Sequence, residues 1–241
     1  MYVSKKARID KVLLAESAVV LGESVIGQGS IVDINTIIGY PIRSKIRGLE
    51  VGDNNLYLEA LDAVSDGSIL GSKVHIRPGT SIYEGTVIGN SVETGHNVLI
   101  RENVRIGDNT VIGSSSVIDG RVRIGNNVRI ESGVYIPPES IIEDNVFLGP
   151  FALVTNDRYP MSKKLIGVYI EEGAAIGANA ILIAGVKIGR HSIVAAGSIV
   201  TRDVPSESVV AGVPARIVSD RWEFERKKRE WEEGGVQTWM Q

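Results

Sequence analysis

Aliphatic residues recur at every sixth position over most of this chain. Between Leu70 and Val154, fifteen positions lie six apart and fourteen are aliphatic, with Thr94 the exception. Val, Ile and Leu supply 73 of 241 residues, so chance predicts about 4.5 of fifteen. The aliphatic series also covers 14–38 and 170–200. A period of six matches neither a helix nor a long strand, so it predicts short strands joined by corners.

The residues between the aliphatic positions indicate how the chain turns. Glycine often follows the aliphatic residue, and Asp or Asn comes next, as in Gly107-Asp108-Asn109. These residue types adopt turn angles at low cost, so each six-residue unit, or hexad, predicts one strand and one corner. Three hexads, or 18 residues, would close a triangular coil, and coils would stack about 4.8 Å apart. The aliphatic series would fill the interior of this all-β prism.

The hexads from Arg8 to Val218 resemble those of the left-handed β-helix hexapeptide-repeat acyltransferases. Composition and periodicity leave the handedness open, so the left-handed parallel β-helix is what the resemblance implies. It also implies a homotrimer with sites between adjacent prisms, and one β-helix domain over residues 1–218.

The aliphatic series slips twice, which predicts two excursions from the prism. Ile38 and Leu70 are separated by two residues more than five hexads, so one excursion lies near 39–67. Val154 and Ile170 are separated by four residues more than two hexads, so a loop projects within 155–167. Such interruptions often carry function, but for 39–67 simple packing against the prism is an equal alternative.

The segment 219–241 is expected to form a short C-terminal α-helix and tail. It is rich in charge and tryptophan, with Ser219 or Asp220 as candidate N-cap and Gly234 as candidate end. We expect the helix to cover the exposed strand edge of the last coil. Contact with a coenzyme or a neighbouring chain is the alternative.

A C-terminal motif points to acyl-CoA. The coenzyme-binding end of these transferases resembles three segments of this chain: Ala195-Ala196-Gly197-Ser198, Thr201-Arg202 and Ala211–Arg216. The resemblance implies that small residues and backbone amides hold the pantetheine arm of acetyl-CoA. Guanidinium and ammonium groups suit its phosphates. The alternative is that small residues simply fit tight coils. The candidate coenzyme-binding residues are Ala178, Lys187, Ala196, Thr201, Arg202 and Arg216.

The projecting loop suggests the acceptor. Residues 143–150 and Thr155-Asn156-Asp157 resemble the branch that N-acetylates amino sugars on nucleotide carriers. The resemblance makes Asn156 and Asp157 the candidate acceptor-site and catalytic residues, with loop shaping as the alternative. Many O-acetylating members have a histidine in this loop, where Tyr159 stands here. An amine acceptor needs less help from a general base than a hydroxyl does.

His96 is a third catalytic candidate and supports the alternative of O-acetyl transfer to a sugar hydroxyl. It follows Thr94-Gly95, in a stretch similar to one in some family members. Three 18-residue steps separate it from Pro150, which places the two about 14 Å apart. A structural role at a corner is the other interpretation.

Bulk properties exclude several function classes. The chain has no cysteine and a net charge of −3, so disulfides, thiol catalysis and a polyanion-binding surface are not expected. A zinc enzyme resembling γ-class carbonic anhydrases is disfavoured, and no metal site is expected, because the three histidines occupy different hexad positions. A non-catalytic trimeric scaffold stays open. No apolar stretch suggests a signal peptide or membrane span, so a cytoplasmic protein without membrane or nucleic-acid partners is expected.

Overall fold

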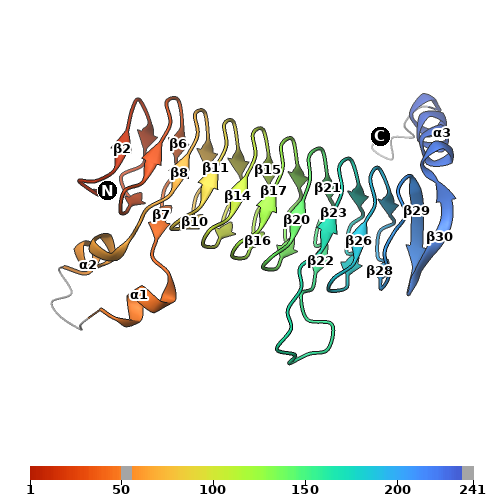
Figure 1. Ribbon diagram of the computed structural model, residues 1–241. Coiled ribbons are helices and arrows are strands. Elements are labelled where there is room, and N and C mark those ends of the chain that lie inside the picture. The colour runs from red at the N-terminus through yellow and green to blue at the C-terminus, as the bar shows by residue number, and fades with distance from the viewer. Residues whose placement is uncertain (50–55, 235–241) are drawn as a thin grey trace, which may run out of the picture.

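The computed structural model describes residues 1–49 and 56–234. Its strands form three sheets that make the three faces of an elongated prism (Figure 1). From β1 to β28 successive strands belong to sheets A, B and C in turn, so each full coil contributes one strand to every face. We name the edges of the prism by the sheets that the chain connects there: A/B, B/C and C/A.

Almost all strands are two residues long. Sheet A contains β1 (Tyr2–Val3), β4 (Val19–Val20), β7 (Ile37–Tyr40), β10 (Ser81–Tyr83), β13 (Leu99–Ile100), β16 (Val117–Ile118), β19 (Tyr135–Ile136), β22 (Leu153–Val154), β25 (Ile181–Leu182) and β28 (Ile199–Val200). Sheet B contains β2 (Arg8–Ile9), β5 (Val25–Ile26), β8 (Ile69–Leu70), β11 (Val87–Ile88), β14 (Arg105–Ile106), β17 (Arg123–Ile124), β20 (Ile141–Ile142), β23 (Tyr169–Ile170) and β26 (Lys187–Ile188). Sheet C contains β3 (Leu13–Leu14), β6 (Ile31–Val32), β9 (His75–Ile76), β12 (Glu93–Thr94), β15 (Val111–Ile112), β18 (Arg129–Ile130), β21 (Phe147–Leu148), β24 (Ala175–Ile176), β27 (Ile193–Val194), β29 (Ser208–Gly212) and β30 (Ala215–Asp220).

Strand pairing confirms the predicted coil of 18 residues. Leu99 pairs with Val117, and Val117 pairs with Tyr135, so equivalent residues of successive coils lie side by side. All named pairings are parallel except that of β29 with β30. The predicted fold class, an all-β parallel solenoid with a short C-terminal helix, is confirmed.

The core confirms the role of the aliphatic series and adds a second one. Each of the fifteen positions from Leu70 to Val154 is at most 4 % exposed, Thr94 included. A smaller residue two positions earlier in the hexad is buried as well. Examples are Val74, Thr80, Val92, Val98, Ser116 and Ala152. Each hexad therefore buries one large and one small side chain, and close packing in the narrow prism requires both sizes.

The corners show why glycine follows the aliphatic residue, and the reason differs from the predicted one. Left-handed backbone falls two residues later, at positions such as Asn109 and Asn127 (φ 56° and 54°). Gly113 is not in that conformation. A Cβ at Gly113 would collide with the backbone of Glu131 and Ser132 in the next coil. Close stacking of coils, rather than turn angle, is what excludes a side chain there.

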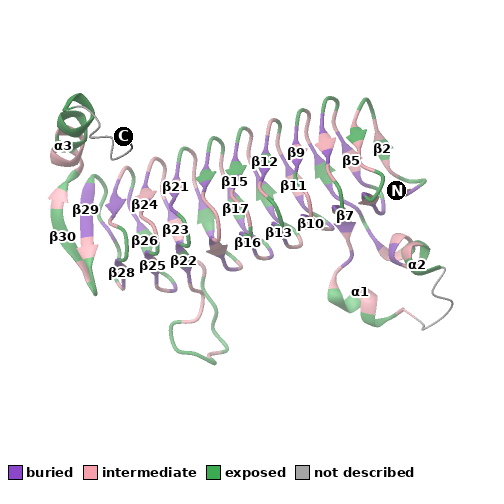
Figure 2. Ribbon diagram, turned by 180° about the vertical axis from the view of Figure 1, so that it is seen from behind, coloured by how far each residue is buried: buried purple, intermediate pink, exposed green. Residues whose placement is uncertain are grey.

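Both excursions leave the prism at the A/B edge. The first follows β7 and contains α1 (Arg43–Arg47) and α2 (Tyr57–Val64); residues 50–55 of the predicted 39–67 excursion lie outside the described residues. The second is the loop 155–167 between β22 and β23. Figures 1 and 2 show both projecting on the same side of the prism.

Glu84, at the A/B edge, holds the first excursion in place. Its side chain is 5 % exposed and accepts hydrogen bonds from the Ile42 and Asp66 backbone amides, at 3.1 and 2.7 Å. Lys45 Nζ lies 2.9 Å from the same carboxylate and 2.6 Å from Asp66. Burial alone would lower the pKa of Lys45, but these hydrogen bonds outweigh it and raise that pKa.

At the C-terminal end, α3 (Arg221–Glu233) begins as predicted. The Asp220 carboxylate accepts a hydrogen bond from the Glu223 backbone amide, and Gly234 is the C-cap. The expectation that this helix covers the strand edge is wrong. β30 folds back on β29 in an antiparallel pair and occupies the edge of sheet C. The predicted tail beyond Gly234 lies outside the described residues.

Candidate functional site

The A/B edge brings predicted acceptor and coenzyme residues into one column. Asn156, Ala184 and Arg202 each stand two residues after an aliphatic position, on three successive coils. Thr201 precedes Arg202 at the same edge. With coils about 4.8 Å apart, the column from Asn156 to Arg202 spans about 10 Å.

Hydrogen bonds attach the loop 155–167 to this column. Thr155 Oγ1 accepts a hydrogen bond from the Ala184 backbone amide at 2.9 Å. Arg158 donates to the Thr201 carbonyl at 3.3 Å, two coils away from the start of the loop. The loop therefore lies along the edge toward the predicted coenzyme residues.

Asp157 shapes the loop from within. Its Oδ1 accepts from the Tyr159 amide at 3.0 Å, and its Oδ2 accepts from the Ser162 amide at 3.1 Å. Both carboxylate oxygens therefore stabilise the turn at the loop tip. This arrangement favours the loop-shaping alternative for Asp157.

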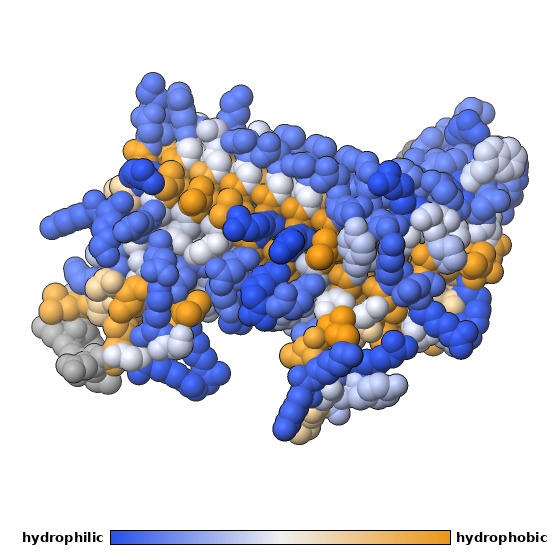
Figure 3. Space-filling view, viewed as in Figure 1, coloured by the Kyte–Doolittle hydropathy of each residue, from blue (hydrophilic) through white to orange (hydrophobic). Residues whose placement is uncertain are grey.

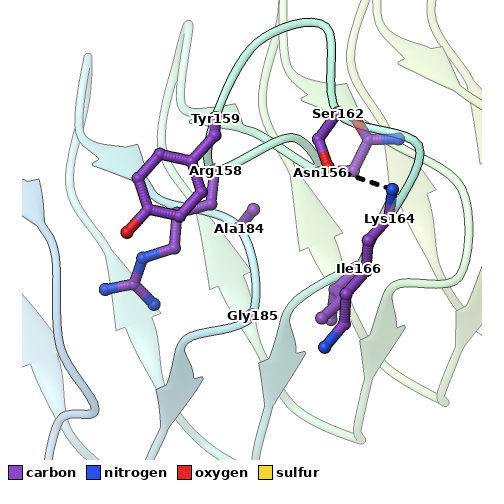
Figure 4. A pocket seen from close by; sticks show the side chains of 8 residues that line it. All are labelled: Asn156, Arg158, Tyr159, Ser162, Lys164, Ile166, Ala184 and Gly185. Atoms are coloured by element: carbon purple, nitrogen blue, oxygen red, sulfur yellow. Dashed lines mark hydrogen bonds between the residues drawn. The ribbon is translucent and has the colours of Figure 1, made fainter.

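A hollow of about 290 Å³ lies between the loop and the next coil. Figure 4 shows Arg158 and Tyr159 on one side of it and Ser162, Lys164 and Ile166 on the other. Asn156 lines the hollow from the base of the loop, and Ala184 and Gly185 line it from the prism. Two cationic side chains and an amide thus surround a small cavity. Neither Arg158 nor Lys164 was among the predicted site residues.

Arg202 and Arg216 share a second recess. It has a volume of about 340 Å³ and lies where β28 meets the β29–β30 pair. Both arginines are exposed, and in the described part of the chain neither has a carboxylate oxygen within 4.0 Å. Asp203 also lines the recess, but its Oδ1 accepts from the Lys187 amide at 2.9 Å. Two predicted phosphate-binding residues are therefore together and available.

Lys187 is already engaged. Its ammonium lies 2.7 Å from Glu171 and 5.5 Å from the centre of the Tyr169 ring. The hydrogen bond to Glu171 raises the pKa of Lys187, and the same contact lowers that of Glu171. A phosphate would have to compete with Glu171 for this lysine.

Ala178, Ala196 and His96 lie on the C/A edge, across sheet A from the loop. Ala178 and Ala196 are in adjacent coils, and the Gly197 amide donates to the Ala178 carbonyl at 2.8 Å. Ala196 also lines a groove of about 600 Å³ between sheet C and α3. His96 is exposed in the same column, three coils from Pro150. Within one chain, His96 therefore lies on a different edge from Asn156.

Thr94 has a structural role beside His96. It is fully buried, and its Oγ1 accepts a hydrogen bond from the Arg77 amide at 3.0 Å. The His96 amide in turn donates to Ser114 Oγ at 3.0 Å. The polar residue in the aliphatic series thus completes hydrogen bonding between coils.

Across residues 1–49 and 56–234, His, Asp and Glu side chains form no group of three that could hold a metal ion. In the described part of the chain, none of the helices combines the length and apolar character that crossing a bilayer requires.

Several stretches of the chain match models of known protein families. The model of the bacterial transferase hexapeptide, described as six repeats, matches residues 85–120, 121–156 and 167–202. A second model, the hexapeptide repeat of succinyl-transferase, matches residues 103–138. Hexapeptide repeats of the transferase type therefore match residues 85–156 and 167–202, which make up just under half of the chain. The matched repeats end at Arg202, on the A/B edge.

The chain is similar in sequence to 2,3,4,5-tetrahydropyridine-2,6-dicarboxylate N-acetyltransferases of Staphylococcus aureus. The identity is 43% over 86 residues, which cover 36% of this chain and 35% of that protein. The matched segment thus spans about a third of the length of these curated relatives.

Three solved structures are among those similar to this chain. A UDP-N-acetylglucosamine acyltransferase from Campylobacter jejuni is 15% identical with a TM-score of 0.49, covering 93% of this chain and 83% of that one. The GDP-perosamine N-acetyltransferase PerB from Caulobacter crescentus, solved with CoA and GDP-perosamine, is 26% identical with a TM-score of 0.37, covering 68% and 64%. A hexapeptide-repeat acetyltransferase from Vibrio cholerae is 25% identical with a TM-score of 0.40, covering 55% and 72%.

Proposed function

We propose that this protein transfers an acetyl group from acetyl-CoA to the amine of a nucleotide-linked amino sugar. The observation that carries the proposal is the A/B edge, where the loop 155–167 contacts the Thr201–Arg202 turn. The transferase repeats reach this edge, and the 43% identity to N-acetyltransferases supports an amine acceptor.

The coenzyme would use the C-terminal coils. Arg202 and Arg216, which have no carboxylate partner among the described residues, would bind its phosphates. Ala178 and Ala196 present small side chains and backbone groups at the C/A edge, which suits a thin pantetheine arm. Because these alanines lie on a different edge from Arg202, one coenzyme molecule would have to cross sheet A or bind between two chains.

The reaction requires little covalent help from the protein. The neutral amine attacks the thioester carbonyl carbon, the carbon–sulfur bond breaks, and CoA leaves as a thiolate while the amine loses a proton. The enzyme must hold the two reactants in line and stabilise the oxyanion with an N–H group. In this proposal Asn156 faces the acceptor, and Asp157 positions the loop by its two amide hydrogen bonds.

A homotrimer would bring other groups to the site. Sheet A presents an almost continuous apolar outer column to solvent, which suits burial against neighbouring copies. His96 of one chain would then face the loop of another, and this is the arrangement that O-acetyl transfer to a sugar hydroxyl would need.

A second acceptor class follows from the curated relatives. They acetylate tetrahydropyridine dicarboxylate, and the hollow lined by Arg158 and Lys164 offers two cations for two carboxylates. In this alternative the coenzyme and the loop have the same roles. Arg158 and Lys164 would bind the carboxylates of the acceptor and not the phosphates of a nucleotide sugar.

The deciding experiment is an acceptor panel with acetyl-CoA and the purified protein. UDP-, dTDP- and GDP-linked amino sugars, their hydroxyl analogues and tetrahydropyridine dicarboxylate are compared by release of free CoA and by product mass. Acetylation on nitrogen of a nucleotide sugar is expected. Transfer to a hydroxyl, or to the dicarboxylate alone, would replace the proposal with one of its alternatives.

A variant pair tests the coenzyme site. Arg202→Gln should weaken acetyl-CoA binding by about 10-fold, because it removes a charge-assisted contact to phosphate. Arg190→Gln is the control, since Arg190 lies 3.2 Å from Glu172 and is already paired. Calorimetry measures both. Equal affinity of Arg202→Gln and the wild type would remove Arg202 from the site.

A further inference from the structure

Two arginines oppose each other on sheet B, and neither forms an ion pair with a described residue. Arg105 of β14 pairs directly with Arg123 of β17, so their side chains leave the same face one coil apart. Both side chains are exposed. Like charges directly opposite on a sheet destabilise the pair. The position therefore calls for a physical explanation.

No carboxylate neutralises the pair within the described residues. Another strand arginine, Arg129, lies 2.6 Å from Glu131, and Arg101 and Arg121 also have acidic partners. By contrast, across residues 1–49 and 56–234 no carboxylate oxygen lies within 4.0 Å of the Arg105 or Arg123 guanidinium. The neighbours above and below in the column are Val87 and Ile141, which are aliphatic. Figure 3 shows this face as an apolar stripe interrupted by strongly hydrophilic side chains.

A recess brings the pair together with a third arginine. It has a volume of about 330 Å³ and is lined by Asn103, Arg105, Arg121, Arg123, Glu139 and Ile141. Arg121 is paired with Glu139. Within this recess three arginines against one glutamate leave two positive charges. Arg123 also lines a neighbouring recess with Glu143, Asp144 and Glu172, but among the described residues none of these carboxylates forms an ion pair with it.

We propose that Arg105 and Arg123 bind a phosphate dianion or a diphosphate on sheet B. Guanidinium groups bind phosphate oxygens through paired N–H donors, and an anion of charge −2 would balance the recess. Such an anion would also remove the repulsion between the two arginines. The site lies several coils from Arg202 and Arg216, and it does not depend on acetyl transfer.

Direct binding tests this site without coenzyme or acceptor. Calorimetry with inorganic pyrophosphate at fixed ionic strength should give a saturable 1:1 isotherm for the wild type. Arg105→Gln and Arg123→Gln should each weaken binding by about 10-fold, because each removes a charge-assisted contact. Arg129→Gln is the matched control, an exposed strand arginine on another face with its own carboxylate, and it should bind as the wild type does.

Thermal unfolding supplies an independent readout. In low salt without phosphate, Arg105→Gln should melt at a higher temperature than the wild type, because the like-charge contact is gone. Added pyrophosphate should raise the melting temperature of the wild type but not that of the double Arg105→Gln, Arg123→Gln variant.

A comparison of UDP with pyrophosphate identifies the source of the phosphate. Tighter binding of UDP, lost in both variants, supports a nucleotide; equal affinities support the diphosphate group alone. Absence of saturable pyrophosphate binding to the wild type would overturn the site. Unchanged affinity in both Arg105→Gln and Arg123→Gln would do the same.

Discussion

At the scale of single residues, stacking distance decides which side chains the corners accept. Gly113 sits where the next coil's backbone occupies the space of a Cβ, whereas Gly197 has left-handed backbone (φ 69°) and open space around it. Two glycines of one prism are therefore required for different reasons.

We expect Gly113→Ala to destabilise the fold by about 1–3 kcal/mol, the usual range for forcing atoms into a packed site. Gly197→Asn is the control and should change stability by less than about 1 kcal/mol, because asparagine tolerates the left-handed region. Urea denaturation measures both. A Gly113→Ala protein as stable as Gly197→Asn would contradict the stacking explanation.

Residues with a repeating environment were predictable, and those with a unique environment were not. The aliphatic series repeats one burial pattern in every hexad, so a single sequence reveals it. The two hydrogen bonds of Asp157 depend on how one loop folds. The facing of Arg105 and Arg123 is an intermediate case: their separation of 18 residues is visible in the sequence once the coil length is accepted.

At the scale of elements, the first excursion is held by one buried carboxylate. Neither α1 nor α2 has a side-chain N-cap. Among the described residues of these two helices, Leu61 of α2 is the one that is buried. Glu84 instead joins the start of the excursion to its end through Ile42, Lys45 and Asp66. These helices were not predicted, because contacts distant in sequence stabilise them.

Glu84→Gln should loosen this excursion by about 1.5–3 kcal/mol, the range for hydrogen bonds to a charged group. Hydrogen exchange of the α2 amides should accelerate while exchange in the coils stays unchanged. Asp66→Asn is the control: the Asp66 side chain is 78 % exposed, so its ion pair with Lys45 should contribute less than about 1 kcal/mol. The anchoring role fails if the two variants exchange alike.

At the scale of the whole molecule, sheet A is the face best suited to self-association. Its outward column is apolar at nearly every coil, and its aliphatic members include Leu99, Val117, Leu153, Ile181 and Ile199. Sheet B instead presents Arg105, Arg123 and Lys187 in the equivalent column.

Under the proposed trimer, Leu99→Arg should reduce the mass in solution from three times 26.0 kDa to that of one chain. The substituted side chain would stay on the surface of a monomer, so the coils should remain folded. Val111→Arg on sheet C, where Val111 is 41 % exposed, is the control and should leave the mass unchanged. Sedimentation equilibrium distinguishes the two; a wild type of one-chain mass refutes the assembly.

Because both excursions leave the A/B edge, the prism fixes their separation in whole steps. The strands at their bases, β7 and β22, are five coils apart in sheet A, or about 24 Å. Adding or deleting one 18-residue coil between them would change that span by one strand spacing and leave both loops intact. The number of coils between β7 and β22 therefore sets the distance between the two excursions. Duplication of a single coil would be enough to change that distance.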